Sequence, residues 1–186
     1  MKKTYTSLLM LIAGAFFFSA CEQCKNPTIT EPTVDEYAWL VHERGDILIY
    51  ENEKGERVKY SVTNKAKQTV VPAGAAMDNC IDKLDTQAIV LLEDSTNLLP
   101  DLATFILKTP EKFEVRIGVY ERGDWLLDVN TPTYPSKTVN SVMYDNVYEI
   151  KLVNTLKNGI KHILFNKEHG FLYLEYNNGS FITRVS

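Results

Sequence analysis

The sequence predicts an all-β fold, and two observations favour it. Apolar and polar residues alternate with a period of two in several segments, as at Val58, Tyr60 and Val62, and this period is typical of strands with one face in water. Short apolar segments near the C-terminus are separated by turn-forming pairs such as Asn158-Gly159, which suit hairpins because both residues tolerate a positive φ. We therefore expect an antiparallel meander of about ten short strands with little helix, forming a barrel, a half-barrel or a sandwich.

The first half of the chain contains a clear hairpin followed by a less regular stretch. Strand composition at Ile47–Asn52 and Glu56–Thr63 flanks a Glu53-Lys54-Gly55 turn. Beyond it the pattern predicts a strand at Gln68–Val71, a short helix at Ala75–Leu84, a buried strand at Gln87–Glu93, and a segment at Ala103–Lys108 that suits strand and helix equally.

The second half is more regular. Alternation predicts strands at Phe113–Val119 and Trp125–Val129, joined by a turn, with a loop at Thr131–Pro135. Five further strands are expected at Thr138–Val142, Val147–Val153, Ile160–Phe165, Phe171–Tyr176 and Phe181–Val185. The Tyr144-Asp145-Asn146 segment is expected to be a turn between the first two of these five.

The N-terminus has the three parts of a secretory signal. Lys2 and Lys3 precede an uncharged, mostly apolar run from Leu8 to Phe18, and small residues follow it. This run is shorter than the roughly 20 residues that a membrane-spanning helix needs. We therefore expect residues 1–20 to be a signal peptide.

The end of that segment, Phe18-Ser19-Ala20-Cys21, resembles the lipobox of bacterial lipoproteins, with Phe18 where those proteins more often have Leu. The resemblance implies cleavage before Cys21 and its modification with acyl chains such as palmitate. It also implies an anchor in the cell envelope, with the outer membrane favoured and the domain in the periplasm or at the cell surface. We expect residues 21–35 to be the lipidated Cys and a flexible tether, and residues 36–186 to be a single β-rich domain.

The C-terminal segments resemble a module of small, uncharacterised β-rich bacterial lipoproteins. The resemblance rests on four short segments and covers about a quarter of the chain: Tyr144-Asp145-Asn146-Val147-Tyr148, Ile160-Lys161-His162-Ile163, His169-Gly170-Phe171 and Asn178-Gly179. It implies the fold and no activity.

The charge of the expected mature chain limits its partners. Without Lys2 and Lys3, the 24 acidic residues outnumber the 18 remaining basic ones, and the chain is mildly acidic. Nucleic acid would require a basic face, so we do not expect it as a partner. Adsorption to anionic lipid is disfavoured for the same reason, so the membrane contact would come from the lipid on Cys21.

Cysteines, histidines and acids give no strong metal pattern, and we expect no metal and no cofactor. Cys24 and Cys80 could form a disulfide in an oxidising compartment or remain two unpaired thiols, because connectivity cannot be read from sequence. Asp78, Asp82 and Asp85 are spaced to share one face of the expected helix. Carboxylates on such a face could bind Ca²⁺, but the spacing is not that of an EF-hand, and a solvated helix face is the favoured interpretation.

No catalytic motif is present. The sequence lacks a Gly-x-Ser-x-Gly elbow, a His-Glu-x-x-His helix and a Gly-rich phosphate loop. His162 and His169 fall on adjacent expected strands or their turn and could face each other, although surface hairpin histidines are the usual case. We therefore expect no catalytic residue.

Aromatic residues give the one indication of function. Trp125, Tyr148, Tyr173 and Tyr176 lie on expected strands, and Tyr and Trp combine apolar area with a polar group, which suits binding surfaces. These four residues would line a pocket for a small apolar ligand, or instead fill the core or an interface with an envelope protein. The sequence thus favours a non-catalytic envelope protein that binds a ligand or partner. An accessory subunit of an envelope complex is the alternative, and an enzyme with a dispersed site is a third hypothesis.

Overall fold

The computed structural model describes residues 26–75, 80–153 and 156–185, and most of this part of the chain is β-strand. The elements are β1 (Thr28–Ile29), α2 (Val34–Tyr37), β2 (Ile47–Asn52), β3 (Arg57–Val70), β4 (Lys83–Asp94), β5 (Leu102–Lys108), β6 (Phe113–Val119), β7 (Gly123–Leu127), β8 (Tyr134–Val139), β9 (Val142–Lys151), β10 (Ile160–Asn166), β11 (Gly170–Tyr176) and β12 (Phe181–Arg184). The all-β prediction is confirmed, since the four-residue α2 is the single α-helix among the described residues.

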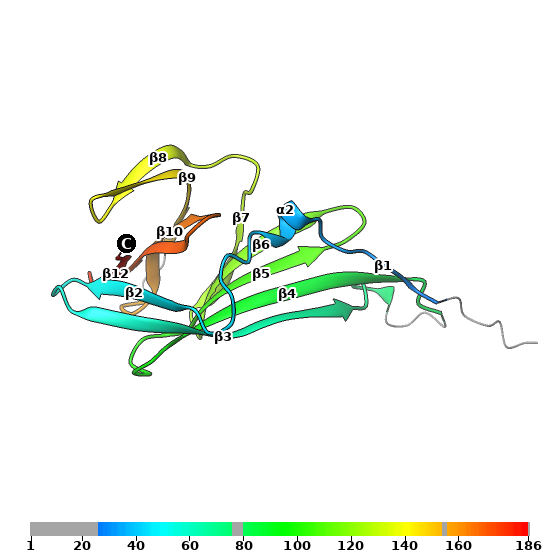
Figure 1. Ribbon diagram of the computed structural model, residues 1–186, viewed down its shortest axis with the longest axis horizontal. Coiled ribbons are helices and arrows are strands. Elements are labelled where there is room, and N and C mark those ends of the chain that lie inside the picture. The colour runs from blue at the N-terminus through cyan, green and yellow to red at the C-terminus, as the bar shows by residue number, and fades with distance from the viewer. Residues whose placement is uncertain (1–25, 76–79, 154–155, 186) are drawn as a thin grey trace, which may run out of the picture.

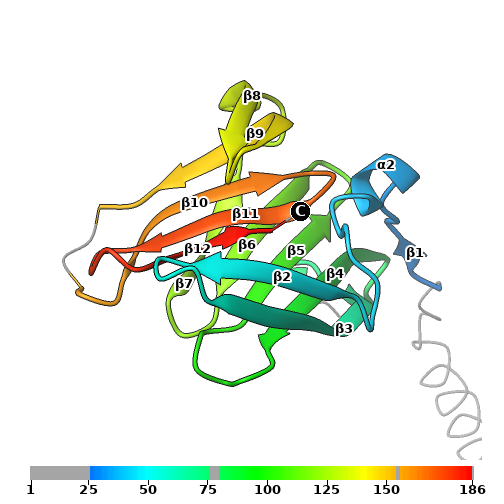
Figure 2. The ribbon, with the colours of Figure 1, turned by 60° about the vertical axis from the view of Figure 1, so that its left-hand side comes forward.

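The strands form one 12-stranded sheet, which curls into a half-barrel (Figures 1 and 2). Along its main path the order is β7-β6-β5-β4-β3-β2-β12-β11-β10-β9-β8, and β1 pairs in parallel with β4. Nearly all neighbours are consecutive in the chain, as in a meander. The exception on this path is the antiparallel pair of β2 and β12, where Tyr50 lies opposite Arg184. This pair joins the N-terminal and C-terminal halves into a single sheet.

The main core lies on the inner face of the curl, where alternate side chains of the strands meet. Tyr50, Tyr60, Ile163 and Phe165 are all fully buried there, and each such side chain contributes on the order of 2 kcal/mol by leaving water. The two tyrosines pack edge to face, with ring centroids 5.4 Å apart. Their hydroxyls donate hydrogen bonds to the carbonyls of Phe171 and Pro100, so burial leaves neither hydroxyl unsatisfied.

A second, smaller core lies on the other face of the sheet, beneath the β8–β9 hairpin. Strand β9 is bent: it pairs with β8 up to Val147 and with β10 from Val147 onward. Asn146 lies at the bend with a φ of 52°. The bend lifts the hairpin out of the sheet and over the outer face of β10 and β11 (Figure 1). Buried side chains of both layers pack together there, namely Val139, Tyr144, Val147, Leu164 and Leu172.

The segment expected to be a flexible tether is, from residue 28 onward, held on the domain. The amide of Thr28 donates to the carbonyl of Asp82, and that of Thr30 to Leu84. Thr33 caps α2, its side chain accepting from the Glu36 amide while the Glu36 carboxylate accepts from the Thr33 amide. Three ion pairs then join the segment to β3, to the end of β5 and to the β10–β11 turn. They are Glu31–Lys67, Glu36–Lys108 and Asp35–Lys167. Because backbone and side chains both find partners, residues 28–37 belong to the folded unit.

Three local predictions are corrected by the structure. The helix expected at Ala75–Leu84 is absent from residues 80–84, where the chain enters β4 instead. Asp82 and Asp85 therefore share no helix face, and Asp78 lies outside the described residues. The turn expected at Tyr144–Asn146 is part of β9, and the strand expected at Thr138–Val142 contains the actual turn. That turn is Asn140-Ser141, in which both residues have the positive φ of a two-residue hairpin loop, 47° and 67°.

The expected signal peptide (residues 1–20), the lipidation site Cys21 and Cys24 lie outside the described residues. Within the described part, no helix is long and apolar enough to cross a membrane.

Candidate functional site: a cleft beneath the β8–β9 hairpin

The four aromatic residues predicted to line one pocket occupy separate places. Tyr148 is buried in the main core, where its ring packs against Trp39 and its hydroxyl donates to the carbonyl of Val129. Trp125 packs against the edge of the same core from β7. Tyr176 is buried at the far end of β11. Tyr173 alone among the four has its side chain on the outer face, in the cleft described next.

This cleft, called the β8 cleft below, has a volume of about 430 Å³. One wall comes from β8 and its turn, and the floor comes from the outer face of β10, β11 and β12. Its lining consists of Lys137, Thr138, Val139 and Asn140 in the wall and His162, Leu164, Tyr173, Phe181 and Thr183 in the floor. Asn140 donates a hydrogen bond from Nδ2 to the carbonyl of Arg184, 3.2 Å away, which ties the hairpin tip to the end of β12. The bend in β9 is thus what creates the cleft.

Three rings form a row along its floor. The rings of His162 and Tyr173 meet edge to face with centroids 5.6 Å apart. Tyr173 and Phe181 are tilted by 32° at a centroid distance of 5.5 Å. Strand alternation explains the row, because His162, Tyr173 and Phe181 come from adjacent strands on the same face.

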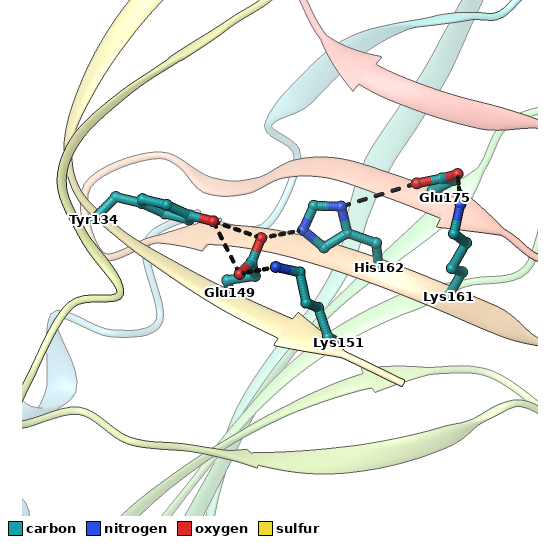
Figure 3. A network of polar contacts seen from close by, with 6 residues as sticks. All are labelled: Tyr134, Glu149, Lys151, Lys161, His162 and Glu175. Atoms are coloured by element: carbon teal, nitrogen blue, oxygen red, sulfur yellow. Dashed lines mark hydrogen bonds and ion pairs between the residues drawn. The ribbon is translucent and has the colours of Figure 1, made fainter. Parts of the chain in front are cut away.

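At one end of the cleft, His162 belongs to a polar network centred on Glu149 (Figure 3). Nε2 of His162 lies 2.8 Å from Oε1 of Glu149. The Tyr134 hydroxyl donates to both carboxylate oxygens at 3.0 Å, and Nζ of Lys151 lies 2.9 Å from Oε2. Because an ionised carboxylate only accepts hydrogen bonds, Nε2 of His162 must have the proton. The other ring nitrogen, Nδ1, faces Glu175 at 3.9 Å.

The charges of this network are balanced locally. The Glu149 side chain is 7 % exposed. Burial alone would raise its pKa, but hydrogen bonds from Lys151, Tyr134 and His162 hold the pKa of Glu149 below its ordinary value. Glu175 is paired with Lys161, whose Nζ lies 2.6 Å from Oε1. Each carboxylate therefore has its own lysine, and the network keeps the His162 ring in a fixed orientation.

His162 and His169 do not form the pair that their positions in the sequence allowed. His169 lies in the β10–β11 turn, where its ring packs edge to face against Tyr144 at 5.1 Å. A histidine oriented by a carboxylate is half of a nucleophile-activating arrangement. Among the hydrogen bonds of the described residues, none joins His162 to a serine, threonine or cysteine. No group of three or more His, Cys, Asp or Glu side chains in the described ranges is arranged to hold a metal ion.

No known protein-family model matches the chain, and neither a curated protein sequence nor a solved structure is significantly similar to it. The site is therefore interpreted from its own geometry. Sequence reasoning selected Tyr173 but missed the Glu149–His162 contact, because the two residues lie diagonally across β9 and β10, where His162 faces Lys151 and Leu164 faces Glu149.

A second hollow lies on the outer face of the other half of the sheet. This outer groove, of about 480 Å³, is lined by apolar residues that include Ile89, Leu91, Ala103 and Phe105, with Asp101, Glu121 and Asp124 among its acidic residues. Gly118 makes room for the Phe105 ring, since an added Cβ at Gly118 would meet Phe105 at 2.8 Å.

Proposed function

We propose that this protein is a lipid-anchored envelope protein that binds a small molecule in the β8 cleft and catalyses no reaction. The observation that supports binding is the cleft itself: about 430 Å³ falls within the range of small-molecule sites, roughly 300–1,000 Å³. Its floor combines apolar and aromatic side chains with a few polar groups in fixed positions, the usual composition of such sites. The envelope location rests on the lipobox-like sequence ending at Cys21.

Binding is favoured over catalysis by what surrounds His162. Both ring nitrogens face carboxylates, and each carboxylate has a lysine partner. The His162 ring is therefore fixed in orientation, and the charges at this end of the cleft are balanced. Among the described residues, no hydrogen bond joins His162 to a serine, threonine or cysteine that it could activate as a nucleophile.

The test is native mass spectrometry of the protein isolated from its own envelope, compared with two tryptophan variants. Thr183→Trp places an indole on the cleft floor beside Tyr173, whereas Met143→Trp places one on the exposed side of β9, away from the cleft. We expect a mass of a few hundred daltons that disappears on denaturation, present in wild type and Met143→Trp and absent from Thr183→Trp. A ligand retained equally by both variants would contradict binding in the β8 cleft.

The alternative function is that of an accessory subunit of an envelope complex, and the outer groove over β4–β6 is the observation that favours it. The same experiment separates the two functions. A stoichiometric polypeptide that is retained by Thr183→Trp and lost in Phe105→Glu would support the accessory role.

A further inference from the structure

The β8 cleft has one cation that is not neutralised by a carboxylate. Lys151 and Lys161 are engaged with Glu149 and Glu175 at 2.9 and 2.6 Å. Lys137 also lines the cleft, and its ammonium lies over the Tyr134 ring, 3.7 Å from the centroid. In the described part of the chain, no carboxylate forms an ion pair with Lys137. Lys137 therefore gives the cleft wall a positive charge, whereas the neighbouring lysines are neutralised by glutamates.

The position of Lys137 is set by the fold. Tyr134 holds the ammonium by a cation–π contact with its ring. The Tyr134 hydroxyl is in turn held by the Glu149 carboxylate. The Tyr134 ring thus connects the lysine to the buried network, and the ammonium is restrained beside the cleft before any ligand arrives.

The floor opposite this wall is apolar. Leu164 is buried, and Tyr173 and Phe181 present their tilted rings to the cleft. None of the residues that line the cleft is an Asp or a Glu. A matching ligand has an apolar body to cover the rings and one anionic end to meet Lys137.

We propose that the β8 cleft binds a small organic monocarboxylate, with its carboxylate at Lys137 and its apolar part over Tyr173 and Phe181. This inference rests on the proposed function, that the cleft binds a small molecule, and adds the chemical class of the ligand. The two glutamates do not repel such a ligand strongly, because each is paired with a lysine of its own.

The experiment uses three probes of one shape and different charge: 3-phenylpropionate, its amide and 3-phenylpropylamine. Binding is followed by amide chemical shifts in residues 21–186, expressed without the signal segment and with Cys21→Ser. In wild type, we expect the carboxylate to bind at least tenfold more tightly than the amide. The amine should bind most weakly of the three. Added salt should weaken the carboxylate alone, because its attraction to Lys137 is electrostatic.

Three variants locate the effect. Lys137→Met should reduce the carboxylate affinity to that of the amide, and Lys137→Arg should largely retain it. Lys112→Met, which removes the same charge in the β5–β6 turn, should change nothing. Equal binding of carboxylate and amide in wild type, or an equal loss in Lys112→Met, would overturn the monocarboxylate assignment while leaving cleft binding intact. Failure of all three probes, or binding unchanged by Thr183→Trp, would overturn cleft binding together with it.

Discussion

Gly170 lies against His42 with no space for a side chain between them. A Cβ added at Gly170 would come within 2.8 Å of Nε2 of His42. Gly170 opens β11 with a φ of 75°, a conformation that L-residues with a side chain rarely adopt. The contact joins the loop before β2 to the start of β11. Glycine is needed at position 170 both for the positive φ and to leave room for the His42 ring.

Gly170→Ala should therefore destabilise the fold for two reasons, backbone strain and steric overlap with His42. We expect a loss of about 2–4 kcal/mol in the free energy of unfolding, measured by urea denaturation. Gly179→Ala is the matched control: its φ is 87°, but nothing lies within 4 Å of its added Cβ. The control should lose only about 1 kcal/mol. Equal losses in the two variants would mean that the His42 contact contributes nothing.

His42 should make stability depend on pH. Burial, with Arg184 nearby, lowers the pKa of His42 from 6.5 to about 4, despite the opposing effect of Asp46. Between these values the unfolded chain binds a proton that the folded chain does not. The free energy of unfolding therefore falls as pH drops from 6.5 towards 4, by on the order of 3 kcal/mol from this group. His42→Gln, which cannot titrate, should show a flatter profile in urea titrations at pH 7, 5.5 and 4.5. Parallel profiles would contradict this assignment.

Asp94 organises the loop that follows β4. Its carboxylate accepts hydrogen bonds from the amides of Thr96, Leu98 and Leu99 and from the Thr96 hydroxyl. Burial would raise its pKa, but these bonds hold the pKa of Asp94 below its ordinary value. The stabilisation is present above the unfolded-state pKa, near 3.8, and is lost as pH falls through the lower folded-state pKa.

Asp94→Ala should cost about 2–3 kcal/mol at pH 7, by chemical denaturation, because it leaves several amide donors without an acceptor. The exposed Asp128, which accepts one amide hydrogen bond from Asn130, provides the comparison. Asp128→Ala should cost less than about 1 kcal/mol. A cost for Asp94→Ala no larger than that of Asp128→Ala would refute the role of Asp94.

The disulfide of Cys80 is expected to join it to Cys24. Cys80 is disulfide-bonded, and its two possible partners, Cys21 and Cys24, lie outside the described residues. Because Cys21 is the proposed lipid site, Cys24 is the partner that remains for Cys80. Non-reducing peptide mapping of the mature protein should give a peptide that links residues 24 and 80. A link between Cys21 and Cys80 would contradict both this pairing and lipidation of Cys21.

Lipidation is tested directly by Cys21→Ser. Acylation and cleavage at a lipobox both require the Cys, so the variant should accumulate as an unmodified precursor. Intact-mass measurement of membrane fractions should show acyl mass on the wild type alone. Acyl chains on the variant would mean that the lipobox interpretation is wrong.

Strands with a regular alternation could be predicted from the sequence, and those shaped by tertiary contacts could not. Phe113–Val119 was predicted to the residue, because every second side chain of β6 faces the core. The length of β3 was missed because its outer half, from Asn64 onward, is mostly exposed and polar and is held by its ladder with β4. The β8–β9 turn was misplaced because Asn140-Ser141 is a weaker signal than Asn-Gly.

The candidate site was beyond sequence reasoning for a related reason. Glu149 and His162 meet only because β9 and β10 pair in one register, and a shift by one residue would place them on opposite faces. The cleft beside them depends on the bend at Asn146, a single positive φ within a strand. Neither the register nor the bend has a local sequence pattern that marks it.

Under the proposed lipidation of Cys21, the docking of β1 on β4 would determine how the domain stands on the membrane. From Cys21 to Thr28 the chain can reach at most about 25 Å when fully extended, so a lipid on Cys21 would hold the domain close to the headgroups. Figure 1 places β1 at the end of the molecule away from the β8–β9 hairpin. Anchored in this way, the protein would turn the β8 cleft towards the aqueous space, and its ligand would arrive from solution rather than from the bilayer.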